Sequence, residues 1–248
     1  MSSSNPLISC ICVTHRKPAL LARAVRCFAA QTYQHKELVI LFEDNDLSTL
    51  AFLAEMQPED NIKLICIQGE PKKTLGELRN LAVRAATGEF ICQWDDDDWY
   101  HMERLEYQHQ VICETKVSGC LLTRWLVYDS SSGRAFLSNR RRWEGSIMCR
   151  KEVFTGRKYE HKVRGEDTDI IEYLHENNHL VYIDDRPDLY VYIYHGNNTW
   201  GVDHFSKIFE KSMELAGYSS LIANILDSEY SPEECRAFIN SMELGLHE

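Results

Sequence analysis

The first hundred residues alternate between short apolar runs and stretches with helical spacing, and this alternation restricts the fold more than any other feature of the chain. The apolar runs, each as long as a strand, are residues 7–13, 37–42, 62–67 and 89–94. The helical patterns between them cover residues 18–31, 48–56 and 74–85. Strands that alternate with helices predict a doubly wound α/β fold, with a mostly parallel central sheet whose ligands bind beyond the carboxyl ends of the strands.

Local signals mark the ends of two of these helices. Pro18 stands where the first helix can begin, because proline fits the first helical turn. Thr74 and Glu77 have the spacing of a capping box, which predicts the start of a later helix. Gly88 is predicted to end that helix, since glycine commonly follows the last helical residue.

The second half of the chain is less regular. Helices are predicted over residues 102–116 and 167–177, and strands over residues 120–129, 146–150, 179–183 and 189–194. Residues 129–133 have the composition of a hairpin turn. After Asp203 we expect helices to the end, with Ser231 and Pro232 opening the last one. No linker or repeat interrupts the sequence, so we predict a single domain over residues 1–248.

The composition is that of an ordinary globular protein, because 44% hydrophobic residues can bury a sizeable core. No stretch approaches the roughly 18 apolar residues of a membrane span, and the N-terminal residues lack the pattern of a signal peptide. We therefore expect a cytoplasmic protein. Nine cysteines form an odd count without a C-x-x-C pair, so neither a disulfide framework nor a zinc site is expected.

The net charge of −11 disfavours nonspecific nucleic-acid binding. Residues 134–164 are an exception, with ten Lys and Arg against three Glu. This basic segment could face an anionic substrate or an anionic membrane surface. It could equally be a solvated face whose charges pair with neighbouring acids.

Two acidic clusters follow predicted strands, one at Glu43 and Asp44 and the other at Asp95–Asp98 in the run QWDDDDWY. Adjacent aspartates offer the hard oxygen ligands that Mg²⁺ or Mn²⁺ takes, often together with substrate phosphates. A solvated acidic turn is the alternative. The buried strand before the run and the tryptophans on both sides of it favour the metal site.

The first junction between a strand and a helix, THRKPALL at residues 14–21, contains no glycine. It therefore lacks the glycine-rich loop with which many α/β folds cradle a diphosphate. We infer that a diphosphate bound here would need a metal ion.

Two long segments resemble the family 2 glycosyltransferases of the GT-A fold. PLISCICVTHRKPALLARAVRCFAAQTYQHKELVILFEDN is similar to the family's opening, with its T-x-R strand end, Q-T-Y helix end and acidic second strand end. LGELRNLAVRAATGEFICQWDDDDWYHMERL resembles the R-N helix, the A-x-G-E-F-I strand, the D-x-D-D cluster and the R-L helix that follow. The resemblance covers about residues 6–105.

By position, the resemblance implies a nucleotide site and a metal site. Asp44 would accept the imide N–H of the base, which points to uracil or thymine. Asp95 or Asp96 would bind the ribose, and Asp97 would hold Mn²⁺ or Mg²⁺ between the two phosphates. The other residues implied in the nucleotide site are Thr14, Arg16, Lys73 and Arg79.

Two residues depart from the family's pattern. Glu43 stands where aspartate is usual, and Asp96 stands where a small residue is common. The second departure leaves open which carboxylate binds the ribose. Arg79, on a predicted helix, could also simply pair with a nearby acid.

The resemblance is weaker in the second half, where RWEGSIMCRKEVF (142–154) and GEDTDIIEYL (165–174) are similar to acceptor-side segments. In the second segment, Asp167 would be the general base, beside Glu166, because transfer needs a carboxylate that takes the proton of the acceptor hydroxyl. Both acids could instead cap a helix N-terminus.

The residues after the last predicted strand could close over the donor. His195 would be a late ligand of the metal or phosphate, or an imidazole whose bonds are satisfied by the local backbone. Asn198, Thr199 and Trp200 would form a lid. Trp143 and Trp200 could stack on acceptor sugars or belong to the core.

The resemblance as a whole implies a metal-dependent inverting glycosyltransferase that uses a UDP- or dTDP-sugar. It would transfer a hexosyl or N-acetylhexosaminyl group to a saccharide or lipid-linked hydroxyl acceptor, in surface polysaccharide biosynthesis and without a nucleic-acid partner. The protein would be cytoplasmic and could associate peripherally with the inner membrane.

The resemblance also divides the single domain into functional parts. Residues 1–100 would bind the nucleotide-sugar, and residues 101–200 would bind the acceptor on a smaller sheet. Residues 201–248 would form a C-terminal helical segment. The alternatives are a noncatalytic nucleotide-sugar or carbohydrate-binding protein and a nucleotidylyltransferase, although THRKPALL lacks the Gly- and Arg-rich loop of the latter.

Overall fold

Two sheets and the helices around them make up the part of the chain that the structure, a computed structural model, describes: residues 5–56 and 59–227. The first sheet contains β1 (Ile8–Val13), β2 (Lys36–Glu43), β3 (Ile62–Ile67), β4 (Phe90–Gln93), β6 (Gly119–Leu122), β9 (Trp143–Arg150) and β10 (Leu180–Ile183). The second contains β5 (Trp99–Tyr100), β7 (Leu126–Asp129), β8 (Arg134–Leu137), β11 (Tyr190–Tyr194) and β12 (Met213–Glu214). The helices are α1 (Pro18–Ala29), α2 (Leu47–Met56), α3 (Leu75–Ala85), α4 (Arg104–Thr115), α5 (Val153–Gly156), α6 (Thr168–Glu176), α7 (Val202–Lys211) and α8 (Ser219–Asp227).

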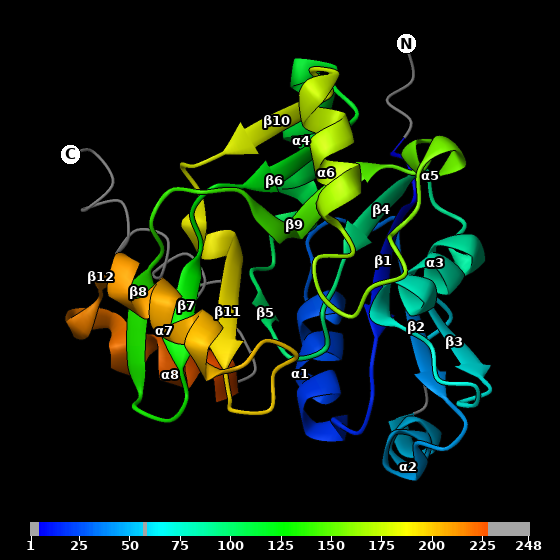
Figure 1. Cartoon of the computed structure of the whole chain (residues 1–248), viewed down its shortest axis with the longest axis horizontal. Helices are drawn as coiled ribbons and strands as arrows, with labels where there is room; N and C mark the ends of the chain where they lie inside the picture. The colour runs from blue at the N-terminus through cyan, green and yellow to red at the C-terminus, as the bar shows by residue number, and fades with distance from the viewer. Residues whose placement is uncertain (1–4, 57–58, 228–248) are drawn as a thin grey trace.

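The predicted fold class is confirmed (Figure 1). The strand order of the first sheet is β10-β6-β9-β4-β1-β2-β3. Strand β1 pairs in parallel with β2 and β4, β2 pairs in parallel with β3, and only β9 runs antiparallel to its neighbours β4 and β6 within the described sheet. All eight residues of β2 are buried, which explains why its sequence is a continuous apolar run rather than an alternating one.

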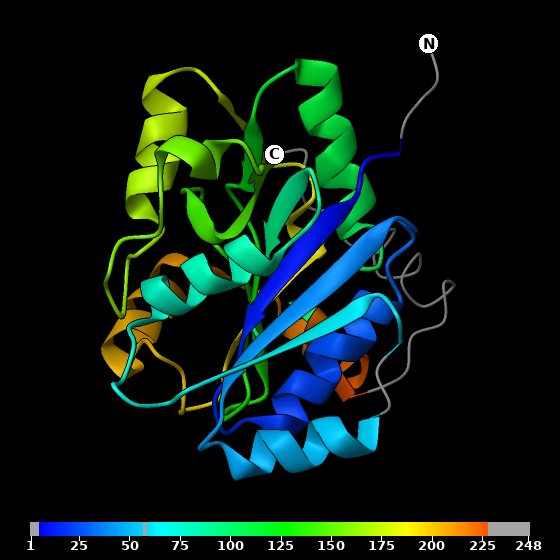
Figure 2. The same ribbon diagram turned by 90° about the vertical axis from the view of Figure 1, so that its right-hand side faces the viewer.

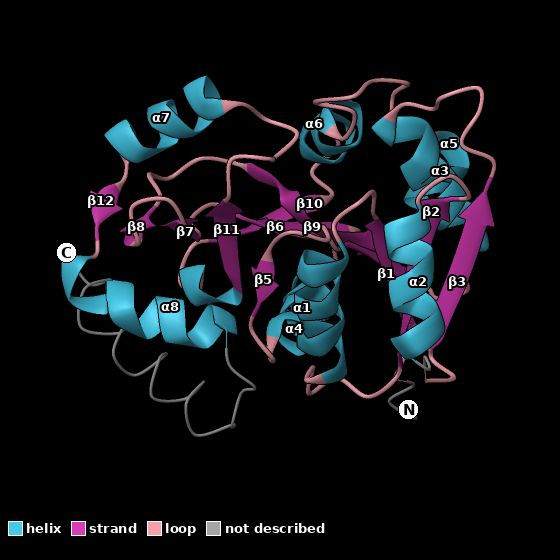
Figure 3. Cartoon of the chain, turned by 90° about the horizontal axis from the view of Figure 1, so that it is seen from below, coloured by secondary structure: helices cyan, strands magenta, loops and turns pink. Residues whose placement is uncertain are grey.

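The helices form two layers around the strands. In Figure 3, α3, α5, α6 and α7 lie on one side of the sheets, and α1, α4 and α8 lie on the other. Figure 2 shows α1 and α3 on opposite faces of β1–β3. Accordingly, Leu21 and Phe28 of α1 belong to one hydrophobic cluster, whereas Ala82 and Val83 of α3 belong to a second one.

The predicted helix starts are confirmed, but the predicted role of Gly88 is wrong. Helix α1 begins at Pro18, and the Thr74 hydroxyl accepts a bond from the Glu77 amide while the Glu77 carboxylate accepts one from the Thr74 amide. Helix α3 ends at Ala85, before Gly88. A Cβ on Gly88 would lie 2.5 Å from the Leu7 carbonyl oxygen, so this glycine permits close backbone packing against the strand.

The predicted strand over residues 120–129 is in fact two strands in different sheets. Strand β6 ends at Leu122, the chain turns, and β7 begins at Leu126. Both strands are almost entirely buried, so their apolar run carries no sign of the break. The continuous helical pattern expected after Asp203 is also interrupted, by β12, and the helix expected at Ser231 lies outside the described residues.

Candidate active site

A cavity of about 810 Å³ lies beyond the carboxyl ends of β1, β2 and β4, where a doubly wound sheet is expected to bind its ligand. Its size falls in the range of small-molecule sites. Its walls come from the β1–α1 loop, α3, the acidic loop after β4, the start of β9 and the segments around residues 163–167 and 195–200. The predicted site residues that line it are Thr14, Arg16, Lys73, Arg79, Asp95, Asp96, Asp97, Trp143, Glu166, Asp167, His195 and Trp200.

Asp44 is the predicted site residue that does not line this cavity. It is exposed, and its Oδ1 accepts a bond from the Gly69 amide at 2.9 Å. The neighbouring Glu43 lines the cavity instead. Its Oε2 lies 3.4 Å from His15 Nδ1, and its buried Oε1 has no hydrogen-bond partner among the described residues. In this conformation the second strand therefore offers the carboxylate of Glu43, not that of Asp44, to a ligand.

The β1–α1 loop contains no glycine, and hydrogen bonds to Asp46 hold its backbone in place. Arg16 has a φ of 56°, in the left-handed region, and its amide donates to Asp46 Oδ2 at 2.5 Å. Asp46 also accepts bonds from the Thr49 amide and hydroxyl and from the Ser48 hydroxyl. Burial opposes its ionisation, but these hydrogen bonds lower the pKa of Asp46 to about 2. Sequence reasoning missed Asp46, although an aspartate just before a helix is a common capping signal.

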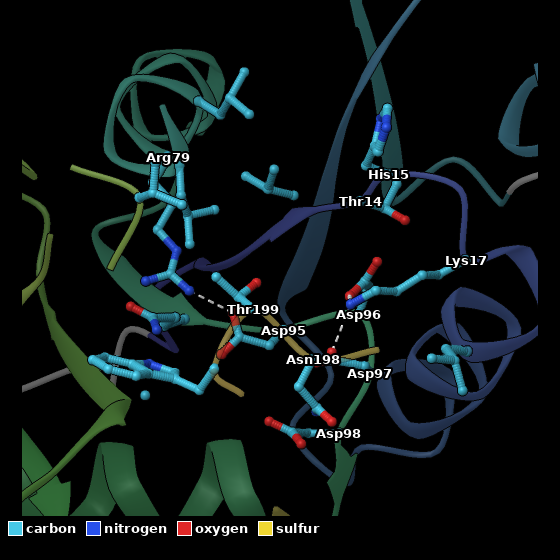
Figure 4. A pocket seen from close by; sticks show the side chains of 18 of the residues that line it. Thr14, His15, Lys17, Arg79, Asp95, Asp96, Asp97, Asp98, Asn198 and Thr199 are labelled. Atoms are coloured by element: carbon cyan, nitrogen blue, oxygen red, sulfur yellow. Dashed lines mark hydrogen bonds and ion pairs between the residues drawn. The ribbon is translucent and has the colours of Figure 1, made fainter. Parts of the chain in front are cut away.

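The acidic loop places its four carboxylates in different surroundings (Figure 4). Asp97 Oδ2 lies 2.7 Å from Lys17 Nζ and 3.1 Å from His195 Nε2. Burial opposes ionisation, but the hydrogen bond from His195 and the charge of Lys17 lower the pKa of Asp97 to about 2. For Asp96, burial and the charge of Asp97 raise the pKa to about 7. Asp97 therefore ionises more readily than Asp96.

Asp98 fastens the acidic loop to the second sheet. It is buried, its Oδ1 accepts a bond from the Ile193 amide at 3.0 Å, and its Oδ2 accepts a short bond from the Tyr190 hydroxyl. Burial, followed by the charge of Asp97, raises its pKa. Both partners belong to β11, and His195 follows that strand directly. Asp98 thus fixes the element that brings His195 to Asp97.

Arg79 joins three carboxylates at the other end of the cavity. This buried guanidinium lies 2.6 Å from Asp95 Oδ1 and 3.6 Å from Asp167 Oδ2, and it forms a very short ion pair with Glu166. It therefore pairs with nearby acids, as the alternative interpretation of its helix position allowed, while also lining the cavity.

Backbone packing places Arg79 beside these acids. A Cβ on Gly76 would lie 1.8 Å from the Glu160 carbonyl oxygen, and the Gly76 amide donates to the Lys162 carbonyl at 3.1 Å. Only glycine lets the first turn of α3 approach this segment so closely. Sequence reasoning missed this residue, because nothing local to Gly76 indicates its distant neighbour.

The acids at this end suit proton transfer. Burial raises the pKa of Glu166 to about 7 and raises that of Asp167, although the charge of Arg79 opposes both shifts. Asp167 precedes α6, but its side chain makes no capping hydrogen bond to that helix. A carboxylate in a cavity with a raised pKa is a better general base than an ordinary surface aspartate.

The chemistry of the donor set fits Mn²⁺ or Mg²⁺. Asp97 Oδ2 and His195 Nε2 converge from segments 98 residues apart, and the buried Asp96 Oδ2 beside them has no hydrogen-bond partner among the described residues. Within residues 5–56 and 59–227 no group of three or more His, Cys, Asp or Glu side chains has the geometry of a metal site. Substrate phosphate oxygens and water would therefore have to complete the coordination, as is common for these ions.

The two predicted acceptor tryptophans have different surroundings. Trp143 stacks on Trp125 at 4.7 Å and is packed against Tyr190 and Tyr192, so it belongs largely to the core while it lines the cavity. Trp200 is 38% exposed, its ring stacks on that of His204, and Arg164 lies over the ring. Trp200 is therefore the more exposed of the two tryptophans.

The predicted lid segment is anchored at its base. Asn198 Oδ1 accepts a bond from the His195 amide at 3.0 Å, and Asn198 Nδ2 donates to the Ile193 carbonyl at 2.8 Å. Asn198 and Thr199 both line the cavity. The segment thus begins from a fixed turn and reaches the mouth of the cavity at Trp200.

The basic segment of residues 134–164 is spread over several elements. Four of its side chains form ion pairs with acids, namely Arg134 with Glu214, Arg140 with Asp184, Arg157 with Asp169 and Lys162 with Glu160. Arg164 lies over the Trp200 ring at 5.2 Å, at the cavity mouth. Among the described residues, no helix has the length and apolar character needed to cross a bilayer.

Solved structures of low sequence identity share this fold. S. aureus TarS in complex with UDP-GlcNAc matches with a TM-score of 0.61 and 17% identity, over 97% of this chain and 72% of that one. The mannosyltransferase PcManGT from Pyrobaculum calidifontis, in complex with GDP-Man and Mn²⁺, matches with a TM-score of 0.60 and 13% identity, over 99% and 82% of the two chains. At these identities the likeness establishes the fold alone.

Sequence comparison identifies the family in addition to the fold. The amylovoran biosynthesis glycosyltransferase AmsB of Erwinia amylovora is 24% identical over 103 residues, which are 41% of this chain and 34% of AmsB. The chain spans less than half the length of the curated relatives that it matches. The family profile described as Glycosyl transferase family 2 matches residues 9–166, well over half of the sequence. With the acidic cavity in place at the carboxyl edge of the sheet, the chain belongs to glycosyl transferase family 2.

Proposed function

We propose that this protein is a metal-dependent inverting glycosyltransferase that moves a hexosyl or N-acetylhexosaminyl group from a UDP- or dTDP-sugar to a hydroxyl acceptor. The observation that carries the proposal is that one cavity holds Asp97 and His195 at one end and Asp167 with Arg79 at the other. In this arrangement a sugar would lie between a metal and diphosphate site at Asp97 and a base at Asp167. The name of AmsB supports a role in polysaccharide biosynthesis.

The donor would bind along the carboxyl edge of the first sheet. Glu43, in place of the predicted Asp44, would accept the imide N–H of the base, and Asp95 or Asp96 would bind the ribose. Asp97 and His195 would hold the metal, which supplies Lewis-acid stabilisation of the departing diphosphate when bound. Thr14, Arg16 and Lys73 would complete the nucleotide pocket.

The acceptor would approach from the side of β9 and α6. Asp167 would accept the proton of its hydroxyl as that oxygen attacks the anomeric carbon from the face opposite the diphosphate. Arg79 would orient the base through its contact with Asp167 and its ion pair with Glu166. Trp200 would stack on the acceptor sugar. Association with an anionic membrane is a separate proposal, and cosedimentation with anionic liposomes would test it.

A thermal-shift screen of UDP-, dTDP- and GDP-sugars with and without Mn²⁺ tests the donor, because a ligand that binds the folded state raises the unfolding temperature. GDP-sugars are included because PcManGT binds GDP-Man. We expect stabilisation by a UDP- or dTDP-sugar that depends on the metal. A donor that binds but is never hydrolysed or transferred would instead indicate a noncatalytic binding protein.

The Asp167→Asn substitution tests the base. We expect turnover to fall about 10²- to 10⁴-fold, the usual contribution of general base catalysis, while donor affinity stays unchanged. Asp169→Asn is the matched control, since Asp169 lies on the same helix and its exposed carboxylate pairs only with Arg157 among the described ion pairs. Transfer by Asp167→Asn at the wild-type rate would contradict the assignment.

A further inference from the structure

One cation of the cavity has no part in the function proposed so far. Lys17, in the β1–α1 loop directly before Pro18, extends across the cavity wall to the acidic loop (Figure 4). Its Nζ lies 2.7 Å from Asp97 Oδ2 and 3.7 Å from Asp96 Oδ1, and its side chain is 22% exposed. Burial lowers its pKa, but the neighbouring carboxylates raise it further, so the ammonium stays charged.

The Lys17 ammonium and a metal would use the same atom. Asp97 Oδ2, which accepts the bond from Lys17, is also the oxygen that faces His195 Nε2 at 3.1 Å. A divalent ion held between Asp97 and His195 would repel the ammonium and take over its partner. A lysine can respond by turning away, because it is a point charge on a flexible stem of four carbons.

The loop that carries Lys17 also lacks the backbone groups with which such loops often hold phosphate. It contains no glycine, and Pro18 removes one of the backbone N–H groups with which the N-terminus of α1 could bind an anion. The ionised carboxylate of Asp97 would repel a diphosphate. The loop can therefore contribute positive side chains to phosphate binding, Arg16 and Lys17, and Lys17 is the one that contacts the acidic loop.

We propose that Lys17 is a built-in cation of the donor site, which neutralises Asp97 when no metal is bound and contacts the diphosphate of the nucleotide when a metal takes its place. The proposal rests on the proposed function, because it assumes that a nucleoside diphosphate binds this cavity. It makes Lys17 a binding residue that exchanges partners, distinct from the metal ligands.

Two opposite changes follow from removing this charge. Without metal, the loss of Lys17 leaves Asp97 with no ammonium to neutralise it, so its carboxylate should repel a nucleoside diphosphate and weaken its binding. Without nucleotide, Mn²⁺ no longer competes with the ammonium for Asp97 and should bind more tightly. A purely structural role for Lys17 predicts that both affinities fall, since both ligands need the intact cavity.

Isothermal titration of Lys17→Met measures both effects. UDP, dTDP and GDP are titrated in EDTA, and MnCl₂ is titrated without nucleotide. We expect the affinity for the preferred nucleotide in EDTA to fall at least about 10-fold, because Asp97 then lacks its charge-assisted hydrogen bond and repels the diphosphate, and the Mn²⁺ affinity to rise several-fold. Lys17→Arg should retain the nucleotide affinity.

Lys207→Met, which removes an exposed lysine of α7, is the matched control for the change in net charge and should alter neither affinity. Thermal unfolding checks that each variant is folded, and Lys17→Gln replaces Lys17→Met if the latter does not fold. Unchanged nucleotide affinity in EDTA, or weaker Mn²⁺ binding, would overturn the proposal.

The two proposals can fail separately. If wild type binds no nucleotide even with Mn²⁺, the proposed function fails and the diphosphate contact of Lys17 fails with it. If wild type binds a nucleotide but Lys17→Met binds it equally well in EDTA, only the proposal for Lys17 is wrong.

Discussion

The two ends of the cavity neutralise their carboxylates in different ways. At one end Arg79 has a forked, buried guanidinium that contacts Asp95, Glu166 and Asp167 at once. At the other end Lys17 offers a single ammonium on a flexible stem to Asp97 and Asp96. A guanidinium with several fixed partners can hold a geometry, whereas an ammonium with one close partner can exchange it. We infer that the end at Arg79 holds its carboxylates in fixed positions, whereas the end at Lys17 can exchange the ammonium for another cation.

The largest effect that this comparison predicts is a loss of stability in Arg79→Met. Removing the guanidinium leaves three carboxylates near one another, two of them buried, so we expect a loss of about 3–5 kcal/mol in the free energy of unfolding. Urea denaturation at pH 7 measures it. Arg79→Lys should recover part of the loss, and Lys17→Met should cost clearly less, since Lys17 is more exposed and His195 still contacts Asp97. Equal losses at the two ends would contradict the comparison.

The pH dependence of turnover sharpens the same comparison. The base acts only when deprotonated, so activity falls as the pH drops through its pKa. Because burial raises the pKa values of Asp167 and Glu166, the acid limb of kcat/KM should lie well above the usual pKa of aspartate, about 3.9. Glu166→Gln removes one of the acids that share Arg79, which leaves more of this cation's charge to Asp167, and should move this limb to lower pH by about one unit. A limb that stays in place or rises would show that the two acids do not titrate together.

The smallest expected effect on stability concerns Trp200. Its ring stacks on His204 and is 38% exposed, so Trp200→Ala should lower the free energy of unfolding by about 1 kcal/mol or less. If this ring binds the acceptor sugar, KM for the acceptor should rise up to about 10-fold while donor affinity is kept. Trp143→Ala is the contrasting variant, because its ring packs in the core and should cost several kcal/mol. An unchanged acceptor KM in Trp200→Ala would remove the stacking role.

Much of the fold is predictable from local sequence, because its signals are local. The apolar runs of β1 and β2 are each buried between two neighbouring strands, and the capping box at Thr74 acts within four residues. The division of residues 120–129 into β6 and β7 was not predictable in this way. Two sheets bury the two strands equally well, so the hydrophobic pattern is the same whether the chain changes sheets or not.

The sequence predicts most residues of the candidate site, but only some of the contacts between them. The motif positions predicted Asp97 and His195 as site residues, and the structure places the two side chains in contact. Lys17 and Asp46 were missed, because their importance lies in contacts with residues 80 and 30 positions away. Sequence reasoning also failed to predict that Glu43, and not Asp44, lines the cavity, for another reason. Adjacent residues on a strand point to opposite sides, and the motif alone does not say which side faces the ligand.

The attachment of Asp98 to β11 has a consequence for attempts to recombine this protein with its relatives. A chimera that joined a foreign acceptor half after residue 100 would keep Asp98 but would lose its partners Tyr190 and Ile193, together with His195. In this chimera the buried Asp98 of the acidic loop would have lost both of its hydrogen-bond partners. A workable exchange of acceptor specificity would have to retain residues 190–195 from the parent, and the smallest transferable unit is therefore discontinuous in sequence.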